Sequence, residues 1–158
     1  MKIINIHIGE IKRGETNSSL RSILGSCVGI ALIWKARQQS IMAHCLLPGN
    51  GKIEAQISGR CVDQAIHSML MLLRAKPQHY CEIEAIIAGG GNMTNPHADK
   101  NAQLIGDLNV KACLNLLNNL GIKIVYSECG GNEGRKLTLN CDSLDYKIEK
   151  IPRMNAIA

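Results

Sequence analysis

The sequence LGSCVGIALIWKARQQSIMAHCLLP, residues 24–48, contains two apolar runs that are separated by a short polar stretch. Residues 28–34 (VGIALIW) and 41–47 (IMAHCLL) have the length and apolar character of strands. The polar residues 35–40 between them fit a turn, and Pro48-Gly49-Asn50-Gly51 ends the second run. The stretch therefore predicts an antiparallel β-hairpin.

The predicted hairpin determines which side chains share a face, because side chains alternate along a strand. In the second strand, one face is expected to carry Met42, His44 and Leu46, and the other Ala43, Cys45 and Leu47. His44 and Cys45 then point apart, so a metal site that uses both is not expected. With the turn near residues 37–39, position 28 lies roughly opposite position 47, and Cys27 is a few residues out of register with His44. A bulge or the twist of the sheet can join these two residues, so the spacing permits the pairing but does not show it.

Cys27 and His44 are candidates for a nucleophile and its base. A free thiol has a pKa of about 8.5, so only a few per cent of it is thiolate near neutral pH. A neighbouring imidazole can take the thiol proton and later protonate a leaving amine. Gly25 and Gly29 allow tight backbone geometry around the cysteine, and amide N–H groups of this segment can face a developing oxyanion. The alternative is that Cys27 packs as a small apolar residue and His44 is a buried, hydrogen-bonded histidine.

Two glycine motifs suggest other chemistry. Residues 25–29 (GSCVG) fit the G-x-nucleophile-x-G elbow of α/β-hydrolases, with cysteine in place of serine. That elbow needs a strand before the nucleophile and a helix after it, whereas here polar residues precede Cys27 and a strand follows. Residues 89–91 (GGG) follow a predicted strand but lack the Lys-Ser/Thr pair of a phosphate-binding loop. Neither motif is the favoured interpretation.

The remaining cysteines and histidines give weaker signals. No C-x-x-C pair is formed by the cysteines at positions 45, 61, 81, 113, 129 and 141, so neither a structural zinc site nor any other metal site is expected. His67 lies off the apolar stripe of a predicted helix and is expected to be solvated. His97 lies in a polar loop and stays open as a functional candidate.

The rest of the chain alternates between strand and helix patterns. Strands are predicted at residues 4–8, 82–88, 122–126, 136–140 and 144–149, with a polar, turn-rich connection at 14–19. Apolar residues at helical spacing predict helices over residues 60–75 and 105–120, the second ending at Gly121. About seven strands and two long helices predict one α+β domain, residues 1–158, whose tail frays from about residue 151.

Composition excludes several classes of protein. The 158 residues carry a net charge of +5, but the 18 basic residues are scattered, and aromatic residues make up 3% of the chain. Nucleic-acid binding is therefore not expected, because it needs clustered positive charge or stacking rings. No apolar stretch approaches the roughly 18 to 20 residues of a membrane span, and the N-terminus does not resemble a signal peptide. Seven cysteines without a repeating pattern indicate free thiols in a reducing cytoplasm.

Five segments together resemble a known family. The segments LGSCVG, MAHCLLP, AGGGNM, IGDLNV and CGGNEGR occur in the order and spacing of the chemoreceptor glutamine deamidases, the CheD family. The resemblance covers the chain from about Ile3 to Glu149. It implies deamidation of glutamine side chains on methyl-accepting chemotaxis receptors, without metal or cofactor, and in some bacteria binding to the CheC phosphatase. It also implies layered mixed sheets flanked by two long helices, similar to the toxin deamidases related to cytotoxic necrotizing factor.

The resemblance assigns roles to particular residues. Cys27 corresponds to the nucleophile that forms a thioester, and His44 to the acid and base. Backbone N–H groups near Gly25 and Ser26 are expected to hold the oxyanion. A catalytic Cys27 is expected to be alkylated faster than the six other thiols.

The sequence also departs from the family pattern. The family has a threonine six residues before the cysteine, where it orients the histidine, but this chain has Arg21, with Ser22 beside it as the candidate third site residue. Three further family residues, an aspartate, a tyrosine and an arginine, are replaced by Lys35, Cys61 and Leu108. These differences leave two alternatives open. One is an adaptor that binds receptor or phosphatase without turnover, and the other is a thiol hydrolase or amidase acting on small molecules.

Overall fold

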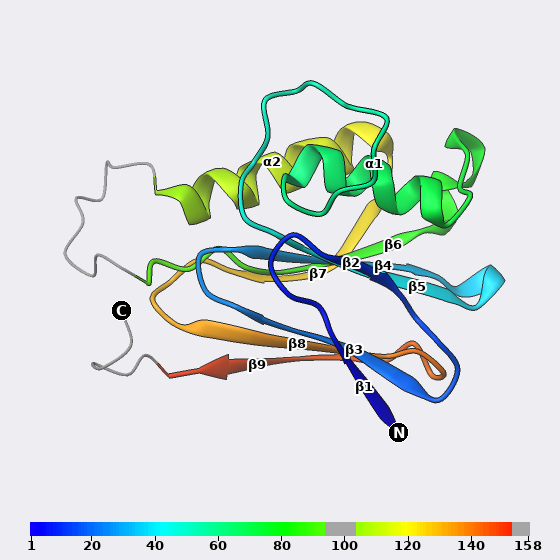
Figure 1. Ribbon diagram of the computed structural model, residues 1–158, viewed down its shortest axis with the longest axis horizontal. Coiled ribbons are helices and arrows are strands. Elements are labelled where there is room, and N and C mark those ends of the chain that lie inside the picture. The colour runs from blue at the N-terminus through cyan, green and yellow to red at the C-terminus, as the bar shows by residue number, and fades with distance from the viewer. Residues whose placement is uncertain (94–103, 153–158) are drawn as a thin grey trace.

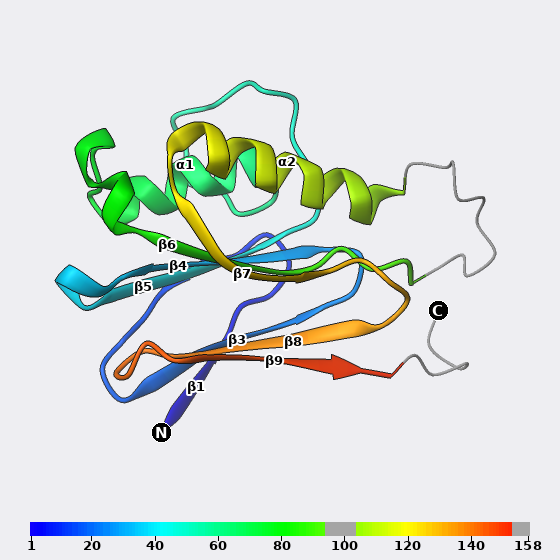
Figure 2. The ribbon, with the colours of Figure 1, turned by 180° about the vertical axis from the view of Figure 1, so that it is seen from behind.

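The computed structural model describes residues 1–93 and 104–152, which form a three-layered α+β architecture (Figure 1). A four-stranded sheet has the order β1 (Lys2–Asn5), β3 (Ser18–Leu24), β8 (Gly134–Asn140), β9 (Tyr146–Ile151). A five-stranded sheet has the order β2 (Ile11–Arg13), β5 (Gln39–Cys45), β4 (Val28–Trp34), β6 (Glu84–Gly89), β7 (Lys123–Cys129). The helices α1 (Val62–Leu72) and α2 (Ile105–Leu120) cover one face of the five-stranded sheet, and the four-stranded sheet covers the other (Figure 2).

Both sheets are mixed. β1 and β3 pair in parallel, as do β6 and β7, and the other pairs are antiparallel. Two short 3-10 helices, Lys35–Arg37 and Pro77–Glu82, complete the regular structure of the described residues. The α+β class and the two long helices agree with the sequence pattern, and the mixed layers agree with what the family resemblance implies.

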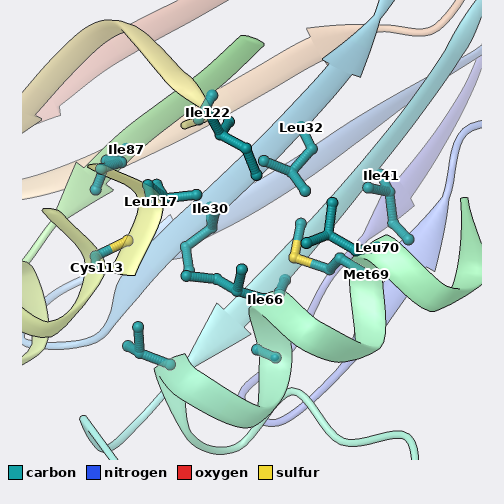
Figure 3. Close-up of a cluster of buried hydrophobic side chains, with 14 of the residues drawn as sticks. Ile30, Leu32, Ile41, Ile66, Met69, Leu70, Ile87, Cys113, Leu117 and Ile122 are labelled. Atoms are coloured by element: carbon teal, nitrogen blue, oxygen red, sulfur yellow. The ribbon is translucent and has the colours of Figure 1, made fainter. Parts of the chain in front are cut away.

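The central strand β4 is buried on both faces, which explains its unbroken apolar run. One face contributes Ile30 and Leu32 to the helix-side core, the cluster that also contains Ile66 and Met69 of α1 (Figure 3). The other face contributes Ala31 and Ile33 to the inter-sheet core, the cluster that lies between the two sheets with Leu20, Met42 and Leu137. A strand between two cores needs apolar residues at every position rather than at every second one.

The hairpin is confirmed, but its register differs from the prediction. The second strand is Gln39–Cys45 instead of residues 41–47, and Val28 pairs with Cys45 instead of position 47. The connection is shorter than expected, because Lys35–Arg37 form a single 3-10 turn that ends at Gln38, with φ of 52°. The predicted faces are correct: Met42 belongs to the inter-sheet core, and Ala43 and Cys45 belong to the helix-side core.

Two strands, β2 and β3, were not predicted from the sequence. The residues expected to form a polar connection up to position 19 include the start of β3. β3 places Leu20, Ser22 and Leu24 on its buried face, so its serines lie inside the protein. A strand therefore does precede Cys27, but a second strand follows where the hydrolase elbow needs a helix, so the structure does not match that elbow.

The other elements lie close to their predicted positions. α2 begins and ends as predicted, and Gly121 adopts the left-handed conformation, with φ of 77°, that caps its C-terminus. β1 ends at Asn5, earlier than predicted, and Ile8 is 57% exposed. Fraying from residue 151 is wrong at Ile151, which ends β9, and residues 153–158 lie outside the described part. None of the described helices is both long enough and apolar enough to span a membrane.

Candidate active site

Cys27 lies where the chain passes from one sheet to the other. β3 belongs to the four-stranded sheet and β4 to the five-stranded sheet, and residues 25–27 connect them. The Cys27 side chain is part of the inter-sheet core and is 6% exposed. The candidate nucleophile is therefore held at the seam between the two layers.

His44 reaches the same seam from β5. It pairs with Gly29 across the hairpin, two residues after Cys27, and its side chain is 5% exposed. Among the described contacts, no hydrogen bond joins Cys27 Sγ to the His44 ring. The fold thus brings both predicted residues into the inter-sheet layer without a direct bond between them.

Ser22 of β3 and the carbonyl of Ile6, the residue after β1, hold the imidazole. His44 Nδ1 lies 3.0 Å from the carbonyl oxygen of Ile6 and 2.9 Å from Ser22 Oγ. The Ser22 hydroxyl donates to the same Ile6 carbonyl at 3.0 Å. Because a carbonyl only accepts, Nδ1 carries the hydrogen in neutral His44, and the lone pair is on Nε2.

Ser22 and not Arg21 faces the histidine. Ser22 is 2% exposed, whereas Arg21 points away from the inter-sheet layer and its Nε donates to Asn5 Oδ1 at 3.1 Å. The one-residue offset follows from the alternation of β3, since Leu20 and Leu24 occupy the same buried face. Ser22 therefore lies where a residue that orients the histidine is needed.

Burial sets the resting charge of the pair. Burial raises the pKa of the Cys27 thiol. Burial also lowers the pKa of His44, and the hydrogen bond to the Ile6 carbonyl opposes this only in part. Both shifts favour a neutral thiol beside a neutral imidazole. A buried thiol with a raised pKa reacts slowly with alkylating reagents, whereas Cys81 is exposed to them. Both facts oppose the expectation that Cys27 is alkylated faster than the other thiols.

The three glycines at 89–91 support the Cys27 segment. The N–H of Gly90 donates to the carbonyl oxygen of Cys27 at 2.8 Å, and the N–H of Gly91 donates to that of Gly25 at 2.9 Å. Gly89 has φ of 106°, and a Cβ there would lie 2.3 Å from the Cys27 carbonyl oxygen. This close approach requires glycine, so the motif braces the nucleophile segment and is not a phosphate loop.

The same bonds leave donors at the site. The carbonyls of Gly25 and Cys27 accept the bonds from the glycine segment, whereas the N–H groups of Ser26 and Cys27 have no acceptor among the described residues. Ser26 and Cys27 thus offer two adjacent backbone donors beside the thiol.

Asn109 was not singled out from the sequence. This residue of α2 is fully buried, and its Nδ2 donates to the carbonyl oxygens of Leu46 at 3.0 Å and of Ser26 at 3.3 Å. It therefore joins α2 to the chain just before Cys27 and just after His44. A polar residue within an otherwise apolar helical stripe was the available signal, since such a residue needs buried partners.

Arg135 was also missed. Its Nε lies 3.1 Å from Glu128 Oε2, and its guanidinium also donates to the carbonyl oxygens of Gly130, at 3.1 Å, and of Glu133. This fixes the loop of the CGGNEGR segment, where Gly130 N–H donates to the Gly89 carbonyl at 3.0 Å. Backbone hydrogen bonds thus join the Gly130 loop to residues 89–91, and residues 89–91 to the Cys27 segment.

Other candidates lie elsewhere. His67 is half-buried, and its Nδ1 lies 2.9 Å from the Asp63 carbonyl, so it is less solvated than predicted. His97 lies outside the described residues. Within the described residues, no three or more His, Cys, Asp or Glu side chains are grouped to hold a metal ion, and all seven cysteines are free thiols.

Comparison with known proteins identifies close relatives by sequence. A family model described as CheD chemotactic sensory transduction matches residues 46–150. The "Probable chemoreceptor glutamine deamidase CheD" of Bdellovibrio bacteriovorus is 39% identical, over 94% of this chain and 95% of that protein. The "Probable chemoreceptor glutamine deamidase CheD 2" of Ruegeria sp. (strain TM1040) is 33% identical, over 96% of this chain and 93% of that protein.

Similarity to solved structures is weaker. Neisseria meningitidis protein NMB0706, of the DUF152 family, has a TM-score of 0.45 and 11% identity, over 75% of this chain and 53% of that one. The Bacillus licheniformis hypothetical protein YfiH has a TM-score of 0.37 and 13% identity, over 70% of this chain and 45% of that one. The expected likeness to the toxin deamidase fold stays a prediction.

Proposed function

Because the chain belongs to the CheD family of chemotactic sensory transduction proteins, we propose that it is a cysteine-dependent protein-glutamine deamidase of chemoreceptors. Its substrates are glutamine side chains on the cytoplasmic region of methyl-accepting chemotaxis receptors, which it hydrolyses to glutamate with release of ammonia. The observation that carries the proposal is the similarity, over nearly the whole chain, to relatives named as chemoreceptor glutamine deamidases.

The first half of the reaction forms a thioester. Cys27 Sγ attacks the carboxamide carbon of the glutamine as His44 Nε2 takes the thiol proton. The negative charge on the amide oxygen is stabilised by the N–H groups of Ser26 and Cys27, next to Gly25. His44 then gives its proton to the leaving nitrogen, the C–N bond breaks and ammonia departs.

The second half consumes one water molecule. His44 Nε2 takes a proton from water, the hydroxide oxygen bonds to the thioester carbon, and the C–S bond breaks. The sulfur regains its proton and glutamate is released. Ser22 Oγ and the Ile6 carbonyl accept the Nδ1 hydrogen throughout, so both stabilise the transient imidazolium and leave Nε2 for proton transfer.

The proposal includes a location and partners. The protein acts in the cytoplasm as one domain, residues 1–158, and binds the CheC phosphatase where the bacterium has one. Its layers are expected to superpose on those of toxin deamidases related to cytotoxic necrotizing factor, and superposition of the two sheets on such a domain tests this.

The experiment is deamidation of a receptor fragment. A cytoplasmic fragment of a methyl-accepting receptor from the same bacterium is incubated with the protein, and ammonia and Gln-to-Glu conversion are followed by peptide mass spectrometry. Wild type and the exposed-thiol control Cys81→Ala convert specific glutamines, and Cys27→Ala converts none. Conversion at the wild-type rate by Cys27→Ala overturns the mechanism.

A binding adaptor is the second candidate. The raised pKa of the buried Cys27 thiol favours it, because a neutral thiol is a poor nucleophile. If the protein is an adaptor, the wild type and Cys27→Ala bind the receptor fragment or CheC with the same affinity, and neither of them releases ammonia.

A further inference from the structure

A cavity of about 420 Å³ opens beside the candidate base. His44 forms part of its wall, and Asn5, Arg21, Ile8 and Ile23 line it from the four-stranded sheet and the segment after β1. The cavity therefore reaches His44, one of the two proposed catalytic residues, whereas Cys27 is not part of its lining.

Arg21 presents a cation to this cavity. Asn5 and Arg21 are partners in the parallel pair of β1 and β3, and the bond from Arg21 Nε to Asn5 Oδ1 orients the guanidinium. Within the described part of the chain, no carboxylate lies within ion-pair distance of Arg21. Glu10 follows the lining residues His7 and Ile8 in the chain, and it pairs with Lys12 at 3.8 Å and accepts the His7 N–H at 2.8 Å.

Two of the residues that line the cavity are exposed isoleucines. Ile8 is 57% exposed and Ile23 is 59% exposed, and both line the cavity that His44 reaches. Large aliphatic side chains exposed together beside a functional group are typical of a surface that binds another protein. A single arginine between isoleucines fits one carboxylate on a partly apolar peptide, whereas a polyanion needs several basic groups.

We propose that this cavity selects the target glutamine: Arg21 binds a carboxylate that neighbours the glutamine on the receptor, and Ile8 and Ile23 contact an aliphatic side chain of the same segment. The inference rests on the proposed function, since it assigns part of the substrate to this cavity. It gives Arg21 a role in recognition, separate from the role of Ser22 in orienting His44.

The test compares deamidation rates site by site on the receptor fragment. Arg21→Gln lowers kcat/KM about fivefold to tenfold, mainly through KM, at glutamines with a neighbouring Asp or Glu, which is the effect of one charge-assisted hydrogen bond. Glutamines without an acidic neighbour keep their rates. Arg21→Lys retains part of the preference, and Arg21→Glu reverses it toward glutamines with a neighbouring Lys.

Two controls isolate the contact. Arg13→Gln makes the same charge change as Arg21→Gln, at an exposed arginine outside the cavity, and keeps the wild-type preference. Replacing the neighbouring Glu of the receptor fragment by Gln removes the effect of Arg21→Gln, as a double-mutant cycle requires. Equal effects of Arg21→Gln at all glutamines, or none at any, overturn the inference.

A binding measurement separates this inference from the proposed function. The affinity of the fragment for Cys27→Ala is compared with its affinity for the same variant carrying Arg21→Gln. Absence of turnover by the wild type contradicts the proposed function. Affinity that Arg21→Gln leaves unchanged contradicts the inference.

Discussion

The two ring nitrogens of His44 have different roles: Nδ1 is held by hydrogen bonds, and Nε2 is left for proton transfer. Nδ1 is bound to Ser22 Oγ of β3, in the sheet that faces β5, and to the carbonyl of Ile6, the residue that follows β1. The ring orientation therefore depends on how the two sheets pack, and not on the strand that carries the histidine. A serine can take this position because the bond needs only a small buried hydroxyl, which the inward face of β3 supplies at residue 22.

The pH dependence of the reaction follows from burial of the pair. Burial lowers the pKa of His44, so kcat/KM stays high until the pH falls below the usual histidine value of about 6.5. Burial raises the pKa of Cys27, so alkylation of this thiol in the free protein increases with pH through a value above the usual thiol pKa of about 8.5. The rate of ammonia release between pH 5 and pH 10 measures the dependence of kcat/KM on pH. Iodoacetamide labelling of each cysteine over the same range, followed by mass spectrometry, measures the dependence of Cys27 alkylation.

Cys81 is the internal reference for the labelling. It is exposed, so it is alkylated faster than Cys27 near neutral pH. The opposite order, or Cys27 labelling that stays constant down to about pH 5, indicates a resting thiolate–imidazolium pair and contradicts the neutral pair.

The catalytic pair could be proposed from sequence, but its support could not. Cys27 and His44 flank a single hairpin, so their proximity follows from a short stretch of sequence, and the family resemblance supports it. The bonds of Ser22 and Ile6 to His44 are contacts between sheets, and their partners are 22 and 38 residues away from His44 in the chain. Such contacts depend on which strand faces which, and alternation along a single strand does not specify this.

At the scale of elements, α2 does more than cover a sheet. Its first turns contact the glycine segment so closely that a Cβ on Gly106 would lie 2.5 Å from the Gly90 carbonyl oxygen. One turn further on, Asn109 binds the carbonyls of Ser26 and Leu46. The helix therefore fixes the position of both catalytic segments relative to each other.

Removal of the Asn109 amide is predicted to affect stability and catalysis together. Asn109→Ala leaves the Ser26 and Leu46 carbonyls without this donor, which costs about 2 to 3 kcal/mol in the free energy of unfolding. The turnover number falls as well, because the two segments lose their common anchor. Urea unfolding and ammonia release measure the two effects.

Asn119→Ala is the matched control, because Asn119 is exposed on the same helix. The control is expected to keep both the stability and the rate of the wild type. If Asn109→Ala unfolds at the same urea concentration as Asn119→Ala, the anchoring role is wrong.

The sequence pattern predicted two kinds of element correctly: helices that bury one face, and a strand that buries both of its faces. α1 and α2 show helical spacing because one face contacts the five-stranded sheet, and β4 is apolar throughout because it is buried twice. β3 escaped prediction because three of its seven residues are serines. Those serines are tolerated inside because the structure supplies partners, such as Glu15 for Ser18 and Ile6 for Ser22.

At the scale of the whole molecule, the candidate site depends on the contact between two sheets. Cys27 and His44 are connected to the five-stranded sheet, and Ser22 and Ile6 belong to the four-stranded side. Apolar burial between the sheets holds the layers together but does not fix their relative position within fractions of an ångström. Directional contacts between the sheets are needed for that, and the Arg135–Glu128 pair is one of them.

Arg135 belongs to β8 and Glu128 to β7, so their ion pair joins the two sheets. Arg135→Met is predicted to lower the free energy of unfolding by about 3 kcal/mol, because it leaves a carboxylate and the loop carbonyls without their partner. The value lies at the lower end for a buried pair, since the Glu128 side chain is 25% exposed and retains some water. Guanidinium chloride unfolding measures it.

Activity is expected to fall in the same variant, because the Gly130 loop supports the glycine segment that binds the Cys27 carbonyl. The double variant Arg135→Met/Glu128→Leu recovers part of the stability, since no charge is then left unpaired, but it does not recover the activity. Lys147→Met breaks an exposed ion pair with Glu149 and costs at most about 1 kcal/mol with no change in rate. Equal destabilisation by Arg135→Met and Lys147→Met would mean that the sheets are positioned by their apolar contact alone.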